Sequence, residues 1–154
     1  MKKPVLIIIA IIYILAIAVV GFLGIPARVY NPKVFVEDIQ LTFDSKLEPL
    51  NITDKDKDAD YKFKIVTSEE VSFYVSAKPL PNEVTDKRCA FERIDTTSYI
   101  TMSTPELKGD YTTTNFTCEA LPLGTTTSVY FKVRPLDGNK NLVKYVKIYI
   151  QNKI

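Results

Sequence analysis

Residues 127–135 read Thr-Ser-Val-Tyr-Phe-Lys-Val-Arg-Pro, and residues 142–151 read Leu-Val-Lys-Tyr-Val-Lys-Ile-Tyr-Ile-Gln. Apolar and polar side chains alternate in both stretches, which is typical of strands with one buried face and one face in water. Between them lies Asp137-Gly138-Asn139, a sequence that favours a tight turn. The sequence therefore predicts a β-hairpin over 127–151, and this hairpin decides the fold class.

The same alternation can be followed from the hairpin toward the N-terminus. It is clear over 61–65 and 71–77, and weaker strands are predicted over 34–43, 89–94, 98–103 and 111–119. Ser103-Thr104-Pro105-Glu106, closed by Gly109, is predicted to form one capped helical turn. Short strands separated by turns are typical of a sandwich. We therefore expect residues 34–154 to form an all-β domain, an antiparallel β-sandwich of seven to eight strands.

Three neighbouring motifs carry a family resemblance. They are Leu121-Pro122-Leu123-Gly124-Thr125, Val129-Tyr130-Phe131-Lys132-Val133-Arg134 and Asp137-Gly138-Asn139. Together they resemble the last corner and hairpin of fibronectin type III and related bacterial immunoglobulin-like domains. The resemblance implies an immunoglobulin-like or fibronectin-like sandwich in which Tyr130 anchors a corner. It implies no particular activity, because such folds carry many unrelated functions.

The N-terminal part of the chain is of a different kind, since residues 4–27 are uncharged and almost wholly apolar. As a helix this run would be about 36 Å long, enough to cross a hydrocarbon core of about 30 Å. Pro4 suits the first turn of such a helix, and Pro26 would end it. The sequence predicts one N-terminal transmembrane helix over 4–27 that precedes the sandwich as an uncleaved signal anchor. A cleaved signal peptide is the alternative.

Lys2 and Lys3 are the only charged side chains before Arg28, and they equal the whole formal net charge of +2. Positive charge at this end favours a short cytoplasmic segment over 1–3. Residues 28–33 are predicted to form a linker between the helix and the sandwich. The expected localisation is the cell membrane, as a single-pass protein with the sandwich extracytoplasmic. The lipid bilayer is then one partner.

Cys89 and Cys118 are the two cysteines of the chain. Both are predicted to lie on strands among apolar neighbours. Outside the cell two cysteines in one domain most often form a disulfide, which is our prediction for this pair. The alternative is two buried thiols, which is the expected state in a cytosolic domain.

Four aspartates alternate along one loop, at Asp54, Asp56, Asp58 and Asp60. Converging carboxylates are typical of calcium sites, so weak calcium binding is one hypothesis for this loop. The EF-hand pattern is absent, because the sixth residue from Asp54 is Ala59 rather than Gly. The interleaved lysines favour the alternative, a solvated loop without a cofactor.

Four tyrosines occupy polar positions of the alternating segments: Tyr74, Tyr130, Tyr145 and Tyr149. Tyrosine is enriched at interfaces, so these residues form a possible interaction surface, or they only cover the sheets. Threonine is dense between Thr96 and Thr127. Exposed β-branched hydroxyls suit the wet face of a sheet, and a glycosylated or sugar-facing surface is the alternative.

The chain offers little for catalysis. It has no His, the commonest general base, and no nucleophile motif or phosphate-binding loop. Its small net charge argues against nucleic acid. We therefore expect a membrane-anchored extracytoplasmic binding or scaffolding module with an unidentified protein or envelope partner and no small-molecule substrate, and not an enzyme. The alternatives are an accessory subunit of a larger membrane or cell-envelope complex and a wall-active glycan hydrolase with a carboxylate pair.

Overall fold

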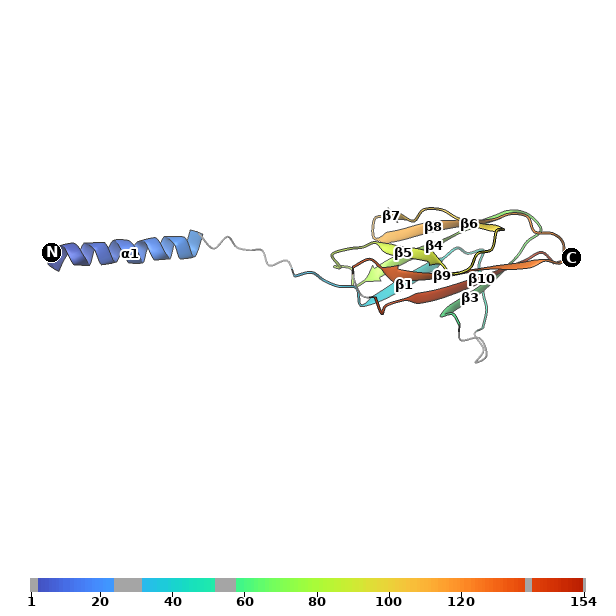
Figure 1. Cartoon of the computed structure of the whole chain (residues 1–154), viewed down its shortest axis with the longest axis horizontal. Coiled ribbons are helices and arrows are strands. Elements are labelled where there is room, and N and C mark those ends of the chain that lie inside the picture. Colours follow the sequence, from blue (N-terminus) through green and yellow to red (C-terminus); the bar gives the residue numbers. More distant parts are fainter. Residues whose placement is uncertain (1–2, 24–31, 52–57, 138–139, 154) are drawn as a thin grey trace. The chain divides into compact units, whose positions relative to one another are not determined.

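The computed structural model describes residues 3–23, 32–51, 58–137 and 140–153. The chain divides into two compact units, Met1–Lys33 and Val34–Ile154, which are described separately below. Figure 1 shows a helix in the first unit and strands in the second.

The first unit contains the α-helix α1, Lys3–Leu23. Pro4 lies in its first turn, where the missing N–H of proline costs little. All the α1 side chains that the structure describes are exposed. The helix therefore has an apolar surface on every described side.

The predicted transmembrane helix over 4–27 is not supported. Within the described residues, no helix combines the length and the apolarity that a membrane crossing requires. Lys2 and 24–27 lie outside the described residues, and the localisation derived from Lys2 and Lys3 stays a prediction.

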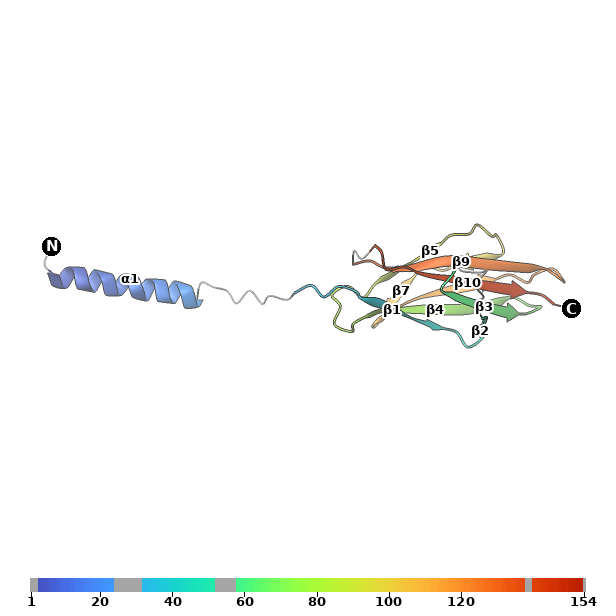
Figure 2. The same ribbon diagram turned by 90° about the horizontal axis from the view of Figure 1, so that it is seen from below.

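The second unit consists of two β-sheets. The first has the strand order β1 (Asp38–Phe43), β4 (Val71–Leu80), β8 (Tyr111–Cys118) and β6 (Ile100–Met102), and β7 (Glu106–Lys108) also pairs with β8. The second has the order β2 (Glu48–Pro49), β3 (Tyr61–Val66), β10 (Lys144–Gln151), β9 (Thr126–Pro135) and β5 (Cys89–Arg93). Figure 2 shows the strands of this unit along their length. The prediction of an all-β domain is confirmed.

The hairpin that decided the fold class is present. Strands β9 and β10 are antiparallel, with Lys144 opposite Val133 and Gln151 opposite Thr126. Every other segment for which alternation predicted a strand also contains one. Of the predicted turn, Gly138 and Asn139 lie outside the described residues.

Three features differ from the expectation. Strand β3 runs parallel to β10, with Tyr61 opposite Val146, so the second sheet is not wholly antiparallel. The expected helical turn near Ser103 is absent. Instead, Glu106–Lys108 forms β7, which pairs with β8 and is joined to it by a two-residue turn. Strand β2 has only two residues, too few to show any alternation.

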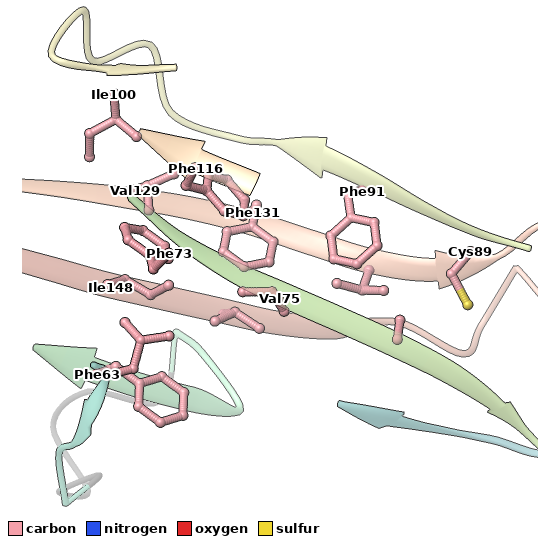
Figure 3. Packing of buried hydrophobic residues seen from close by; sticks show 14 of the residues in the cluster. Phe63, Phe73, Val75, Cys89, Phe91, Ile100, Phe116, Val129, Phe131 and Ile148 are labelled. Carbon is pink, nitrogen blue, oxygen red and sulfur yellow. The ribbon is translucent and has the colours of Figure 1, made fainter. Parts of the chain in front are cut away.

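The two sheets share one core, shown in Figure 3. Phe73 and Phe116 stack within the first sheet at 5.4 Å between ring centroids. Phe116 contacts Phe131 of the second sheet at 4.8 Å, which joins the two layers. The period-two pattern places these rings inside and the intervening polar side chains outside. Each sheet therefore has an outer face on which a site can be built.

Candidate functional site

The outer face of the first sheet is made mostly of hydroxyl, amide and tyrosine side chains, with Lys78 as a charged member. We call it the hydroxyl face and define it by the outward side chains of β1, β4 and β8: Thr42, Ser72, Tyr74, Ser76, Lys78, Tyr111, Thr113, Asn115 and Thr117. Hydroxyls pair across β4 and β8, with Ser72 Oγ 2.9 Å from Thr117 Oγ1 and Ser76 Oγ 2.8 Å from Thr113 Oγ1. These cross-strand pairs give the face a polar surface without requiring charge.

A shallow hollow of about 330 Å³ lies on the hydroxyl face. Thr42, Ser76 and Thr113 form a row across its floor, because they occupy matching register positions on β1, β4 and β8. Tyr74 and Tyr111 stand on either side of this row, 40% and 39% exposed. The hollow thus presents hydroxyl groups between two aromatic rings.

A tight turn positions the residues that line one end of this hollow. Gly109 has a φ of 62°, a conformation that glycine adopts without the steric cost of a Cβ. No described non-glycine residue has a positive φ, so the two-residue Gly109-Asp110 connection is a type II′ hairpin turn. The turn places Lys108 of β7 opposite Tyr111 of β8, and both line the hollow.

The outer face of the second sheet is built differently. We call it the charged face and define it by the outward side chains of β3, β10 and β9: Lys62, Lys64, Tyr130, Lys132, Arg134, Tyr145, Lys147 and Tyr149. Asp58 lies beside it and forms ion pairs with Lys62 Nζ at 2.7 Å and with Lys147 Nζ at 2.9 Å. These two ammonium groups lower the pKa of the Asp58 carboxyl to about 2. Asp58 is therefore a structural counter-ion.

The tyrosines of the charged face are engaged within the protein. The Tyr130 hydroxyl donates a hydrogen bond to the backbone carbonyl of Asp58. Lys147 Nζ lies 5.7 Å from the Tyr130 ring centroid and 5.4 Å from that of Tyr149, within cation–π range. Tyr130 and Tyr145 are 6.1 Å apart between ring centroids. Burial, followed by the Asp58 charge, raises the pKa of the Tyr130 hydroxyl.

Two expectations about this face change. The resemblance implied that Tyr130 anchors a corner, but its hydroxyl instead reaches the turn that precedes β3. Alternation placed Lys62 in water, but its side chain is only 3% exposed. Its ion pair with Asp58 allows this burial, since a paired ammonium group can be partly removed from water.

The calcium hypothesis concerned a loop that is only partly described. Asp54 and Asp56 lie outside the described residues. Asp58 is held by lysines, and Asp60 accepts a hydrogen bond from the Tyr145 amide at 2.7 Å. The part of the chain that the structure describes contains no group of three or more residues suited to hold a metal ion. Weak calcium binding stays a prediction.

The predicted disulfide is wrong, because Cys89 and Cys118 are free and buried. The Cys89 amide donates to Thr112 Oγ1 at 2.9 Å, which places Cys89 beside one end of β8, whereas Cys118 ends that strand. Six residues of extended strand span about 20 Å, while a disulfide joins Cα atoms less than about 7 Å apart. Figure 3 shows Cys89 far along the core from Ile100, the register partner of Cys118.

The Cys89 thiol is also inert. It lines a second hollow of about 340 Å³ with, among others, Phe91, Leu107 and Leu136. Burial, then the nearby Asp137 and Asp86, raises its pKa to about 12. Thiol chemistry requires the thiolate, and a thiol with this pKa stays protonated at neutral pH. Cys89 therefore behaves as a small apolar side chain.

The four predicted tyrosines thus divide between two faces. Tyr74 lies on the hydroxyl face, whereas Tyr130, Tyr145 and Tyr149 lie on the charged face. Tyr111, the second ring of the hollow, was not among the predicted residues. The signal was present, because Tyr111 begins the alternation with Thr113, Asn115 and Thr117.

No protein-family model matches this chain. No curated protein sequence matches it either.

Proposed function

We propose that this protein is a non-catalytic binding module that presents the hydroxyl face of an immunoglobulin-like sandwich to a partner. One observation carries the proposal. Tyr74 and Tyr111 are exposed on either side of a hollow floored by hydroxyls, and the Tyr111 ring also contacts Lys78. On the charged face, Tyr130 is held by a hydrogen bond to Asp58 and by Lys147. Exposed aromatic rings beside adaptable hydroxyl and amide groups are the composition of binding loops in antibodies.

The strand order supports the immunoglobulin-like part of the proposal. In such domains strands A, B, E and D form one sheet, and C, F and G form the other. Here β1-β4-β8-β6 follows the chain order A-B-E-D, and β10-β9-β5 follows G-F-C. Strands β2, β3 and β7 are additions to this scheme.

Site-specific photocrosslinking in the source cells tests the proposal. The photoreactive amino acid p-benzoylphenylalanine replaces Tyr74 or Tyr111, and in a matched control it replaces Tyr145, which is 37% exposed on the charged face. This probe inserts into C–H bonds, so it captures a protein or a glycan alike. We expect discrete adducts from Tyr74 and Tyr111 and none from Tyr145. Absence of adducts from the hydroxyl face, or equal adducts from both faces, would overturn the proposal.

A second candidate function is that of an accessory subunit in a larger protein assembly. It is favoured by α1, whose described apolar side chains, such as Ile7 and Ile14, are 60% and 68% exposed. Helices that are apolar on all sides are usually covered in the functional state. We expect a stoichiometric partner to co-purify with the full chain and to be lost when Ile7, Ile11 and Ile14 are replaced by Asn. Retention of the partner by that variant contradicts this function.

A further inference from the structure

We propose that the hollow on the hydroxyl face binds a neutral carbohydrate chain. The inference rests on the proposed function and names the ligand of the same face. It follows from three properties of the hollow, namely its hydroxyl floor, its aromatic sides and its nearly uncharged lining.

The floor is suited to a ligand that is itself rich in hydroxyls. Ser76 Oγ and Thr113 Oγ1 share one hydrogen bond at 2.8 Å, and each hydroxyl can donate once and accept twice. The pair therefore keeps one hydrogen and several lone pairs outside this bond, and the half-buried Thr113 presents them to a ligand more than Ser76, which is 8% exposed. Thr42, exposed on β1 at the same level, adds a third hydroxyl. Sugars carry both donors and acceptors on adjacent carbons, which matches such a row.

The sides are suited to the apolar faces of sugar rings. A pyranose presents C–H groups on its faces, and these pack on aromatic rings as other apolar surfaces do. Tyr74 is opposite Asn115 in the register, and Tyr111 lies four residues before Asn115 along β8. The Cα atoms of the two tyrosines are therefore about 13 Å apart along the strand direction, which suits two separate rings of one chain rather than one small sugar.

The lining of the hollow is nearly uncharged, which favours a neutral ligand. Five of the six lining residues are uncharged, and the sixth, Lys108, forms an ion pair with Glu106 at 3.5 Å. Lys78 Nζ lies 5.5 Å from the Tyr111 ring centroid, and Asp110 in the adjoining turn is paired with Lys87. Among these groups Lys78 is the cation without a carboxylate partner, and its ammonium group already lies against the Tyr111 ring.

An array of oligosaccharides tests the inference on the purified full chain, in a detergent without a sugar headgroup where one is needed. The array holds neutral cello-, chito-, xylo- and manno-oligosaccharides, with heparin and polygalacturonate as acidic glycans. We expect binding to at least one neutral series, with affinity rising as the oligosaccharide lengthens. Calorimetry with the strongest binder then measures Kd for each variant.

Tyr74→Ala and Tyr111→Ala are each expected to raise Kd at least tenfold, since an aromatic anchor of a binding site typically contributes this much. Thr113→Val keeps the shape and removes one hydroxyl, and it is expected to raise Kd about fivefold. Tyr145→Ala, an equally exposed tyrosine on the other face, is the matched control and should leave Kd unchanged.

Binding to acidic glycans alone, no binding to any neutral series, or equal loss in Tyr145→Ala would overturn the inference. These results are separable from failure of the proposed function. If Tyr74 still crosslinks a protein while the array is negative, the binding face stands and its ligand is a protein. If neither experiment gives a signal, both the inference and the proposed function fail.

Discussion

The two outer faces of the sandwich use similar residues in opposite ways. On the charged face, Tyr130 and Lys147 are committed to Asp58, so its polar groups hold the protein together. On the hydroxyl face, Tyr74 and Tyr111 flank an open hollow whose floor is held by weak cross-strand hydroxyl pairs. Tyr130, whose hydroxyl is hydrogen-bonded within the protein, is therefore less informative about binding than the tyrosines that line the hollow. The distinction can be tested by mutation.

The largest effect should come from the core that supports both faces. Phe116 is fully buried and contacts Phe73 in its own sheet and Phe131 in the other. Phe116→Ala is expected to lower the free energy of unfolding by about 3–5 kcal/mol, through lost burial and a cavity. Urea denaturation measures it. Phe35→Ala, at a side chain 58% exposed, is the control and should change stability by less than about 0.5 kcal/mol. Similar losses in both variants would mean that Phe116 does not join the sheets.

An intermediate effect should come from the counter-ion of the charged face. Asp58→Asn leaves Lys62 and Lys147 without their carboxylate, and we expect a loss of about 1–2 kcal/mol at pH 7. The figure is discounted for solvent screening, because the Asp58 side chain is 44% exposed. Glu48→Gln breaks a more exposed pair with Lys64 and is the control, with a loss below about 0.5 kcal/mol.

The same variant gives a pH signature. The pKa of Asp58 falls from 3.8 to about 2 on folding, so its stabilising effect is complete above about pH 5. It is lost as the pH falls through about 4 toward 2, because the carboxyl is then protonated in both states. The stability difference between wild type and Asp58→Asn should therefore shrink across this range in denaturation curves. A difference that is constant between pH 7 and pH 2 would contradict the assigned role.

The smallest effect should come from the hydroxyl face. Thr117→Val removes an exposed hydroxyl that pairs with Ser72, and valine suits a strand at least as well as threonine. We expect a change in unfolding free energy within about 0.5 kcal/mol by urea denaturation. Thr114→Val, on the same strand but fully buried and bonded to the Ser103 carbonyl at 2.9 Å, is the contrast and should cost about 1–3 kcal/mol. A large loss in Thr117→Val would mean that this face, too, holds the fold together.

Local alternation predicted most of the fold, because the pleat of a strand imposes a period of two on any half-buried segment. It missed β2, because two residues are too few to show a period. It also missed β7, because Pro105 and Gly109 on either side of this strand suit a helical turn as well. The apolar run over 4–27 predicted a transmembrane helix, whereas no helix within the described residues has the length and apolarity that a membrane crossing requires. The disulfide expected for an extracytoplasmic domain was wrong because strand positions do not reveal how far apart Cys89 and Cys118 lie along β8.

Alternation along the chain is enough to predict which side chains of the longer strands point into the core, because the pleat turns successive side chains to opposite faces. The pairing of strands came from the tertiary structure alone: β3 runs parallel to β10, and Tyr74 and Tyr111 share a face while Tyr130 lies on the other. The tertiary structure also decided which polar groups are satisfied, since Asp58 meets Lys147 from 89 residues away. Such contacts depend on which strands pair across long loops, and that choice is made by packing of the whole core rather than by any local pattern.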